Sequence, residues 1–592
     1  MSRTEAFYFA LDSGTSVFAL LDRPAEAPVS STGVLICPPW GWDEAASYRS
    51  RRDWAKELSA DGHPSLRFDL PAAGDSGGDP TTTGLVPLWI EAIHAGAKSL
   101  RTVGGASRVA LLGVGLGALL AQEALARGVF ADELICWGAP PSGRHFAREA
   151  KAFAAMQADR LVDRNRESPM PPDWLEAHGF VLSSETLAAL KALRSDGAPG
   201  SGRALLIGRD GIYDSAGRER LQAVGAEVSE DPGIGWGRFV GHPETTRLPP
   251  SVEQVVRKWL TDDRHSSVEA AAAPVPATGS RAIFSGDGAE RSPFAEEPLR
   301  IVEAYGDAFG ILTQPEPSNG APYCAVFLNA GAIRHVGPNR MWVEAARDLA
   351  AAGIPSLRVD LESIGEADGD PARRARVSDF YDEGFVDQVV AVLDQLERQG
   401  VAGRFRLVGL CAGAYWAFRT ALVDDRVEVA VLINAGALVW HPGILGEREG
   451  RRTGRVLQRH WWGRLLRGEI RWFNLPRIAG QIIVGAQRSL RRSFRRGTAS
   501  GGTAIVTDLD RLQPGRRILL AFSGGEVLQE ELMALGILDR LDNWPDVEVV
   551  DLPGTDHTLR SVIAQRAVAE LLLREVGRDL SAQLPESTGR QR

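Results

Sequence analysis

Cysteine is scarce in this sequence. Of the 592 residues, only Cys37, Cys136, Cys324 and Cys411 are cysteines. No two of them form a Cys-x-x-Cys pair, and the ten histidines do not cluster. This spacing argues against a disulfide framework and gives no sign of a zinc site. We therefore predict reduced thiols, no bound metal and no cofactor.

Long apolar runs and an excess of basic charge are also missing. The sequence has no stretch of about 18 apolar residues, the length that a membrane-spanning helix needs. Residues 1–12 lack the basic start and apolar core of a signal peptide. The formal net charge is -9, which does not favour nucleic-acid binding. These absences together predict a cytoplasmic protein with no membrane span.

The sequence contains a long-range repeat. Pro-Ser-Leu-Arg-Phe-Asp-Leu at 64–70 recurs as Pro-Ser-Leu-Arg-Val-Asp-Leu at 355–361, and a Gly/Asp-rich segment follows each. A chain of this length is too long for one core, so we predict two copies of one domain. The predicted division is a first copy at 1–261, a linker at 262–298, a second copy at 299–578 and a polar tail at 579–592.

Asp360 and Asp370 belong to the repeated segment of the second copy. Aspartates in Gly-rich loops commonly make turns and caps, and we predict that role for both. Around them, short apolar strands alternate with amphipathic helices. This alternation predicts a mostly parallel sheet with helices on both faces in each copy.

The sequence Gly409-Leu410-Cys411-Ala412-Gly413 carries the clearest chemical signal. A mostly apolar strand precedes it and a helix follows, as in the Gly-x-nucleophile-x-Gly turn of α/β-hydrolases. We therefore predict two tandem α/β-hydrolase domains, each doubly wound and each with a helical cap insertion. Cys411 is the candidate nucleophile. The alternative is that Cys411 is a small buried apolar side chain, as unpaired cysteines usually are.

The hydrolase order places an acid and then a histidine after the nucleophile. Glu526 follows a predicted strand at 517–522, and His557 follows the last one. His557 is the candidate base, and Glu526 would orient its ring. Their alternatives are a capping or core histidine and a solvated carboxylate, with Asp556 or Asp510 as substitute acids.

An acyl-transfer site also needs two backbone N–H donors for the oxyanion. One is expected at Ala412, directly after the nucleophile. The other is expected in the turn after the first strand of this stretch, at Ala332. These positions complete the predicted catalytic site of the second copy.

The first copy has Gly115 where the second has its nucleophile. Asp210 and His242 are candidate relics of the acid and the base. A Gly-rich turn also occurs in dinucleotide sites, but this one does not follow the first strand, and the repeat explains its glycines better. We predict that the first copy packs with the second as a structural partner, a lid or a ligand-binding pocket.

The interval between the sixth strand and the acid of the second copy, roughly 436–513, is strongly basic and contains interleaved aromatic residues. Arg491 and Arg492 are representative. This segment has two readings: a helical face that packs on the first copy, or a contact for an anionic ligand or membrane surface. A carrier-bound phosphopantetheine, a CoA thioester or a phosphorylated glycolipid would suit the second reading.

Several motifs carry a family resemblance. They are Cys37-Pro38-Pro39-Trp40-Gly41, Phe68-Asp69-Leu70-Pro71 and Trp137-Gly138-Ala139-Pro140 in the first copy, and Leu328-Asn329-Ala330-Gly331 and Gly409-Leu410-Cys411 in the second. The chain resembles a fusion of two α/β-hydrolases that accompany bacterial exosortase and exopolysaccharide systems, one without a nucleophile and one with cysteine. The resemblance implies a cytosolic hydrolase or acyltransferase.

The sequence thus predicts a cysteine-dependent acyl hydrolase, an esterase or thioesterase that forms an acyl-Cys411 intermediate. Its substrate would be a small-molecule or carrier-bound acyl compound. One alternative is an acyltransferase or cyclase, in which an alcohol or amine resolves the same intermediate. Another is a non-catalytic binding or scaffold protein.

Overall fold

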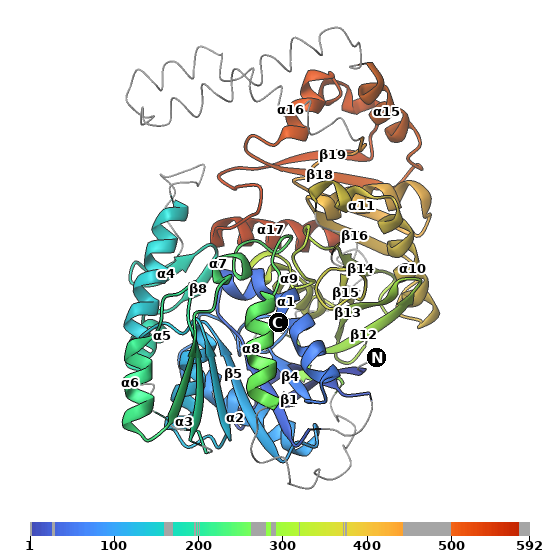
Figure 1. The fold of residues 1–592 in the computed structure, drawn as a ribbon. Coiled ribbons are helices and arrows are strands. Elements are labelled where there is room, and N and C mark those ends of the chain that lie inside the picture. The colour runs from blue at the N-terminus through green and yellow to red at the C-terminus, as the bar shows by residue number, and fades with distance from the viewer. Residues whose placement is uncertain are drawn as a thin grey trace, which may run out of the picture.

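The computed structural model describes most of residues 3–578. The described part excludes 26–29, 159–169, 194–196, 198, 201, 262–279, 286–291, 319, 371, 373–375 and 442–498. The predicted tail at 579–592 and the basic segment around Arg491 and Arg492 therefore lie outside it. Within it, the chain forms two large mixed sheets, which Figure 1 shows in blue-to-green and in yellow-to-red.

The first sheet has eight strands in the order β1-β2-β4-β3-β5-β6-β9-β10. Only the pairs β1/β2 and β2/β4 are antiparallel, and the other pairs are parallel. The central strands are buried along their whole length, as strands covered on both faces should be. The bounds are β1 (Arg3–Ala10), β2 (Ser16–Arg23), β3 (Thr32–Cys37), β4 (Ser65–Phe68), β5 (Arg108–Val114), β6 (Glu133–Trp137), β9 (Arg203–Ile207) and β10 (Glu227–Asp231).

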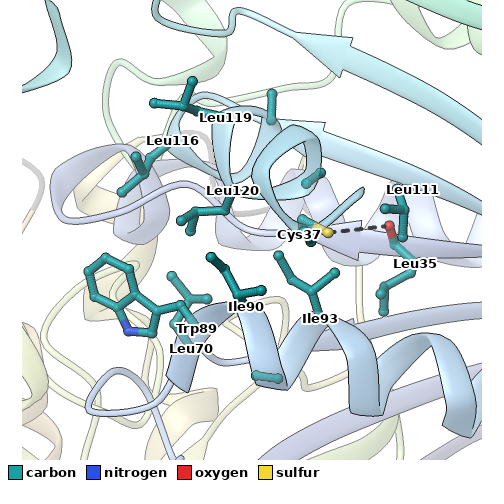
Figure 2. Packing of buried hydrophobic residues seen from close by; sticks show 14 of the residues in the cluster. Leu35, Cys37, Leu70, Trp89, Ile90, Ile93, Leu111, Leu116, Leu119 and Leu120 are labelled. Carbon is teal, nitrogen blue, oxygen red and sulfur yellow. Dashed lines mark hydrogen bonds between the residues drawn. The ribbon is translucent and has the colours of Figure 1, made fainter. Parts of the chain in front are cut away.

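Helices cover both faces of this sheet. On one face, Ile90 and Ile93 of α2 pack beside Leu120 of α3 and the strand residues Leu35 and Cys37 (Figure 2). The other face is covered by α1 and α8. An insertion between β6 and β9 forms α4, the hairpin β7–β8 and α5. The bounds are α1 (Trp42–Ala60), α2 (Leu85–Thr102), α3 (Leu116–Ala126), α4 (Gly143–Ala158), β7 (Leu175–Ala177), β8 (Phe180–Leu182), α5 (Ser184–Lys191), α6 (Ser215–Ala223), α7 (Trp236–Phe239) and α8 (Pro250–Thr261).

The second sheet repeats this order. Its strands run β11-β12-β13-β15-β14-β16-β17-β18-β19, so β12 to β19 match the first sheet and β11 is added at the edge. The pairs from β14/β15 to β18/β19 are parallel. The bounds are β11 (Ala282–Phe284), β12 (Phe294–Glu303), β13 (Gly306–Pro315), β14 (Cys324–Phe327), β15 (Ser356–Asp360), β16 (Phe405–Leu410), β17 (Val427–Ile433), β18 (Arg517–Ser523) and β19 (Val547–Leu552).

Helices also sandwich the second sheet, with α10 and α11 on one face and α9 and α17 on the other. No helix in the described residues has the length and apolar content needed to cross a bilayer. The bounds are η1 (Pro338–Arg340), α9 (Met341–Ala351), η3 (Val377–Tyr381), α10 (Gly384–Arg398), α11 (Ala412–Val423), α15 (Ala499–Asp510), α16 (Val527–Ala534), η5 (Leu538–Asn543) and α17 (Val562–Val576).

The predicted fold class is confirmed, because each copy is an α/β unit with the mostly parallel strand order of an α/β-hydrolase. One boundary differs from the prediction. Strand β11 and the first half of β12 fall inside 262–298, the range predicted as linker. Both pair antiparallel in the second sheet, so part of that range belongs to the second copy.

The two copies contact each other through the repeated segments, and the contacts are reciprocal. Arg67 of the first copy binds Glu366 of the second, with nitrogen–oxygen distances of 2.6 and 3.1 Å. Arg358, the counterpart of Arg67, binds Asp75, the counterpart of Glu366, at 2.8 Å. All four side chains are buried. Two surfaces that meet through equivalent residues form an isologous contact, as in a two-fold dimer.

Arginine–carbonyl contacts extend this symmetry. Arg49 donates to the carbonyls of residues 365, 367 and 369 of the second copy. Its counterpart Arg340 donates to the carbonyls of residues 74, 76 and 78 of the first copy. Each arginine thereby satisfies three backbone acceptors of a Gly-rich loop in the other copy. The chain is thus built as a covalently linked pseudo-dimer.

Candidate active site

Cys411 stands on a strained turn between β16 and α11. Its backbone has φ 56° and ψ −110°, a region that side-chain-bearing residues rarely occupy. The flanking glycines make the turn sterically feasible: a Cβ at Gly409 would lie 2.2 Å from the backbone of Gly413, and one at Gly413 would lie 2.4 Å from the carbonyl oxygen of Asn329. The turn exposes the thiol to a cavity and places it at the start of a helix.

The structure brings His557 and Glu526 to this thiol. Glu526 follows β18 and His557 follows β19, so both loops lie at the same end of the sheet as Cys411. The Nδ1 atom of His557 lies 2.9 Å from an Oε atom of Glu526. Asp556 instead binds Arg560, and Asp510 accepts a hydrogen bond from the Trp544 ring, so neither substitute acid orients the histidine.

The charges of this group depend on each other. Burial alone would raise the pKa of Cys411, but a hydrogen bond and charge from His557 outweigh it and lower the pKa. Burial lowers the pKa of His557, whereas hydrogen bonds to Cys411 and Glu526 raise it to about 10. The lowered pKa of Cys411 and the raised pKa of His557 both favour a thiolate–imidazolium pair, which is the reactive form of a nucleophilic cysteine.

Alkylation should reveal this ion pair. Because the pKa of Cys411 is lowered, its thiolate fraction at pH 7 is larger than that of an ordinary cysteine. We expect iodoacetamide to label Cys411 at a rate that rises less steeply from pH 7 to 9 than the rate of an ordinary thiol. In His557→Gln the rate at pH 7 should fall about tenfold or more and rise steadily towards pH 9. Peptide mass spectrometry after timed labelling measures both rates.

The other three cysteines provide an internal control for that experiment. Burial raises the pKa of Cys136 and of Cys324 to about 12, and it raises that of Cys37 further. All three should stay unlabelled in the native protein. Equal pH profiles in the wild type and in His557→Gln would contradict the ion pair.

Tyr381 is a site residue that the sequence reasoning missed. Its hydroxyl lies 3.9 Å from the Cys411 sulfur and helps to lower the pKa of the thiol. The ring stacks on Trp440, with ring centroids 4.0 Å apart. Tyr381 ends the short helix η3, far from the nucleophile in sequence, and no motif marks it.

One predicted oxyanion donor contacts the thiol, and the other lies in a turn that lines the same cavity. Ala412 begins α11, and its backbone N–H hydrogen-bonds to Cys411 and lowers the thiol pKa. Ala332 lies in a tight turn, residues 330–333, in which the N–H of Ile333 donates to the carbonyl of Ala330 at 3.2 Å. Residues 330–333 line the same cavity as Cys411 and His557. We call this segment the oxyanion turn.

The first copy keeps the elbow but has lost the site. Gly115 has φ 54° and ψ −121°, close to the angles of Cys411. A Cβ placed there would lie 3.6 Å from the ring of Trp236. Asp210 accepts hydrogen bonds from the backbone N–H groups of residues 235–237 and so fixes the start of α7, which carries this tryptophan. Asp210, the predicted relic of the acid, thus holds the Trp236 ring that lies against the turn at Gly115.

His242 is the predicted relic of the base. Among the interactions of the described residues, none joins it to Gly115 or Asp210. Its ring packs edge-on against Trp42, and its Nδ1 atom lies 3.7 Å from an Oε atom of Glu244. All three side chains line the cavity that contains Cys411. This histidine has therefore become part of the second copy's surroundings.

That cavity has a volume of about 1140 Å³ and takes its walls from both copies. The hairpin β7–β8 of the first copy reaches α17, where Glu176 accepts a hydrogen bond from the N–H of Val562 at 3.0 Å. At the hairpin tip, His178 packs on Trp42 and Phe153. Burial and the charge of Arg560 lower the pKa of His178 to about 4, so its ring is neutral.

Among the described residues, no group of three or more histidine, cysteine or acidic side chains is arranged to hold a metal ion. The cavity walls instead combine aromatic rings with a few polar groups, as small-molecule pockets do. The first copy contributes Trp40, Trp42, His178, Phe180, His242 and Glu244, and the second contributes Gly331, Ala332, Arg334, Cys411, His557 and Arg560.

No protein-family model and no curated protein matches this sequence. Solved structures that resemble part of the chain include Est1E from Butyrivibrio proteoclasticus with bound ferulic acid (17% identity, 43% of this chain and 98% of that one, TM-score 0.31). Others are the Pyrococcus furiosus esterase Pf2001 (15%, 49% and 93%, 0.31) and a Mycobacterium smegmatis proline iminopeptidase (17%, 48% and 100%, 0.31). The strand order of each sheet, with an equivalent turn at Gly115 and at Cys411, gives each copy the α/β-hydrolase fold.

Proposed function

We propose that the protein is a cysteine-dependent acyl hydrolase that acts on esters or thioesters. The observation that carries this proposal is the line from Cys411 through His557 to Glu526, on a strained elbow that opens into a cavity. A buried structural cysteine would need neither the imidazole nor the strain. The resemblance of the sequence motifs to exosortase-associated hydrolases stays a prediction.

The proposed reaction has two halves. The Cys411 thiolate attacks the acyl carbon, and the carbonyl electrons move onto oxygen, facing the N–H groups of Ala412 and Ala332. The tetrahedral intermediate collapses, the bond to the leaving group breaks, and imidazolium His557 protonates that group. A water molecule then attacks the thioester, His557 takes its proton, and the acid leaves as Cys411 returns to thiolate.

Intact-protein mass spectrometry tests this proposal. The protein is mixed with p-nitrophenyl esters and acyl thioesters of increasing chain length and quenched with acid within seconds. We expect one added acyl group, located on Cys411 by peptide mapping and absent from Cys411→Ala. Absence of both an adduct and turnover across the panel, or an adduct that persists in Cys411→Ala, would contradict the proposal.

A second arm of the same experiment distinguishes hydrolysis from transfer. Adding alcohols or amines to the acyl-enzyme shows whether free acid or a conjugate accumulates. Accumulation of free acid at every acceptor concentration supports the hydrolase. Conversion mainly to the conjugate would replace it by an acyltransferase that uses the same intermediate. Because Arg491 and Arg492 lie outside the described residues, an anionic carrier remains a proposal to be tested by charge reversal at these positions.

A further inference from the structure

The oxyanion turn is fastened at both ends to one carboxylate of its own copy. Before the turn, the Asn329 amide donates to the carbonyl of Ile333 at 3.1 Å and to Asp360 at 2.8 Å. After the turn, His335 donates its backbone N–H to Asp360 at 2.6 Å and its Nδ1 hydrogen to the same carboxylate at 2.7 Å. The position of the turn therefore depends on where Asp360 and His335 are held.

His335 is held from the other side by the first copy. Its Nε2 atom lies 2.8 Å from a carboxylate oxygen of Asp75. The side chains of His335, Asp75 and Asp360 are completely buried. Burial would lower the pKa of His335, but the two carboxylates outweigh it and raise the pKa to about 9. The ring therefore carries both protons at neutral pH and donates one to each copy.

The neighbouring residue is held in the same way. Arg334 directly follows the oxyanion turn, and its guanidinium binds Asp69 of the first copy at 2.9 and 3.2 Å. It also reaches Asp75 at 3.3 Å. Asp75 is fixed in turn by Arg358 at 2.8 Å. Two carboxylates of the first copy thus grip the chain where it leaves the oxyanion turn.

We infer that Asp75 of the nucleophile-free first copy is a positioning residue that holds, through His335, the oxyanion turn of the second copy. This inference rests on the proposed acyl-transfer function. It gives the first copy a task that requires no nucleophile of its own. Asp75 acts through the turn and not on the sulfur, because the groups that lower the pKa of Cys411 are His557, Tyr381 and the N–H of Ala412.

Comparing acylation with alkylation in Asp75→Asn tests the inference. Acylation by an ester needs the oxyanion donors, whereas alkylation by iodoacetamide needs only the thiolate. We expect the acylation rate to fall about 10- to 100-fold, the range that a small misplacement of a reacting group can cause. The alkylation rate and its pH profile should stay within about twofold of the wild type, since the thiolate is untouched.

Glu366→Gln is the matched control. Glu366 is the counterpart of Asp75 and is equally buried, but its side chain binds Arg67 and Arg52 of the first copy and not the oxyanion turn. It should weaken the contact between copies while leaving acylation near the wild-type rate. Asn329→Ala, which cuts the turn from Asp360 inside the second copy, should reproduce the acylation loss if Asp75→Asn folds poorly.

Hydrogen exchange of the peptide covering 330–336 provides a readout that does not depend on activity. Asp75→Asn should exchange faster there, and Glu366→Gln should not. The inference is overturned if a folded Asp75→Asn protein acylates at the wild-type rate. It is also overturned if acylation and alkylation fall by the same factor in both Asp75→Asn and Glu366→Gln. If the wild type forms no acyl-enzyme, the proposed function fails, while unchanged exchange in Asp75→Asn still overturns the positioning role separately.

Discussion

Replacing Cys411 with alanine will lower the turnover of an accepted ester by about 100,000-fold or more, because the covalent step loses its nucleophile. His557→Ala should lose nearly as much, since the thiol loses the hydrogen bond and charge of the imidazole, and the leaving group loses its proton donor. Initial rates with one p-nitrophenyl ester, compared at equal concentrations of folded protein, measure both losses.

The double variant Cys411→Ala/His557→Ala is the more informative experiment. Groups that act as one unit give losses that do not add, so the double variant should be about as slow as either single one. Glu526→Gln keeps the shape of the side chain but removes the charge beside His557 Nδ1, and it should cost less, about 10,000-fold. Its alkylation rate at pH 7 should fall as well, because Glu526 supports the imidazolium.

Cys324→Ala is the control for this series. Cys324 lies fully buried in β14, and its substitution should leave turnover unchanged. Full activity in Cys411→Ala would contradict a covalent mechanism through Cys411. If the fold-loss of turnover in the double variant equalled the product of the two single losses, Cys411 and His557 would not act together.

The group of Cys411, His557 and Glu526 is largely predictable from sequence, because its signal is local. The two glycines that keep the turn at Cys411 free of backbone collisions stand in one five-residue motif, and the order of nucleophile, acid and base follows the order of the strands. The choice of Glu526 over Asp556 depends on how two loops approach each other, which no local pattern encodes. Tyr381 reaches the sulfur only because η3 packs against α11.

The contact between the copies could not have been predicted from the repeat alone. Repetition shows that Arg67 and Arg358 are equivalent, but not that each binds the carboxylate of the other copy. Asp360 was expected to be a turn or cap residue, and it does accept backbone hydrogen bonds from residues 335 and 366. Its further role, as a partner of buried His335, depends on a side chain that is remote in sequence.

His242 illustrates the same limit. The sequence makes it a candidate relic of the base in the first copy. In the structure it lines the cavity of the second copy, together with Trp42 and His178. Comparison of the two copies predicts which strand a residue follows. Without a nucleophile, however, nothing requires the acid and the histidine of the first copy to stay together.

Arg358→Met should lower the free energy of unfolding by about 3 kcal/mol, because it breaks a buried ion pair. Arg358 binds Asp75 and Glu296, each at 2.8 Å, and all three side chains are fully buried. Removing the guanidinium leaves two carboxylates with one cation fewer, in surroundings that water does not reach. Urea unfolding followed by tryptophan fluorescence measures the loss.

Arg426→Met is the matched substitution outside the contact between copies. Arg426 also binds several carboxylates, those of Asp394, Glu397 and Asp424, but at the surface of the second copy with its side chain 22% exposed. Solvated pairs contribute about 0–1 kcal/mol each, so this variant should lose much less. Equal losses in the two variants would mean that the buried network does not hold the copies together.

Arg67→Met provides the symmetric test. Arg67 is the counterpart of Arg358 and pairs with Glu366 and Asp22, so its loss should match that of Arg358→Met to within about 1 kcal/mol. Arg358→Met should, in addition, slow acylation, because Arg358 fixes the Asp75 that grips His335. If Arg67→Met and Arg358→Met lose similar free energies of unfolding but only Arg358→Met slows acylation, the contact has two separate tasks. Both arginines then join the copies, and only the Arg358 side positions the oxyanion turn.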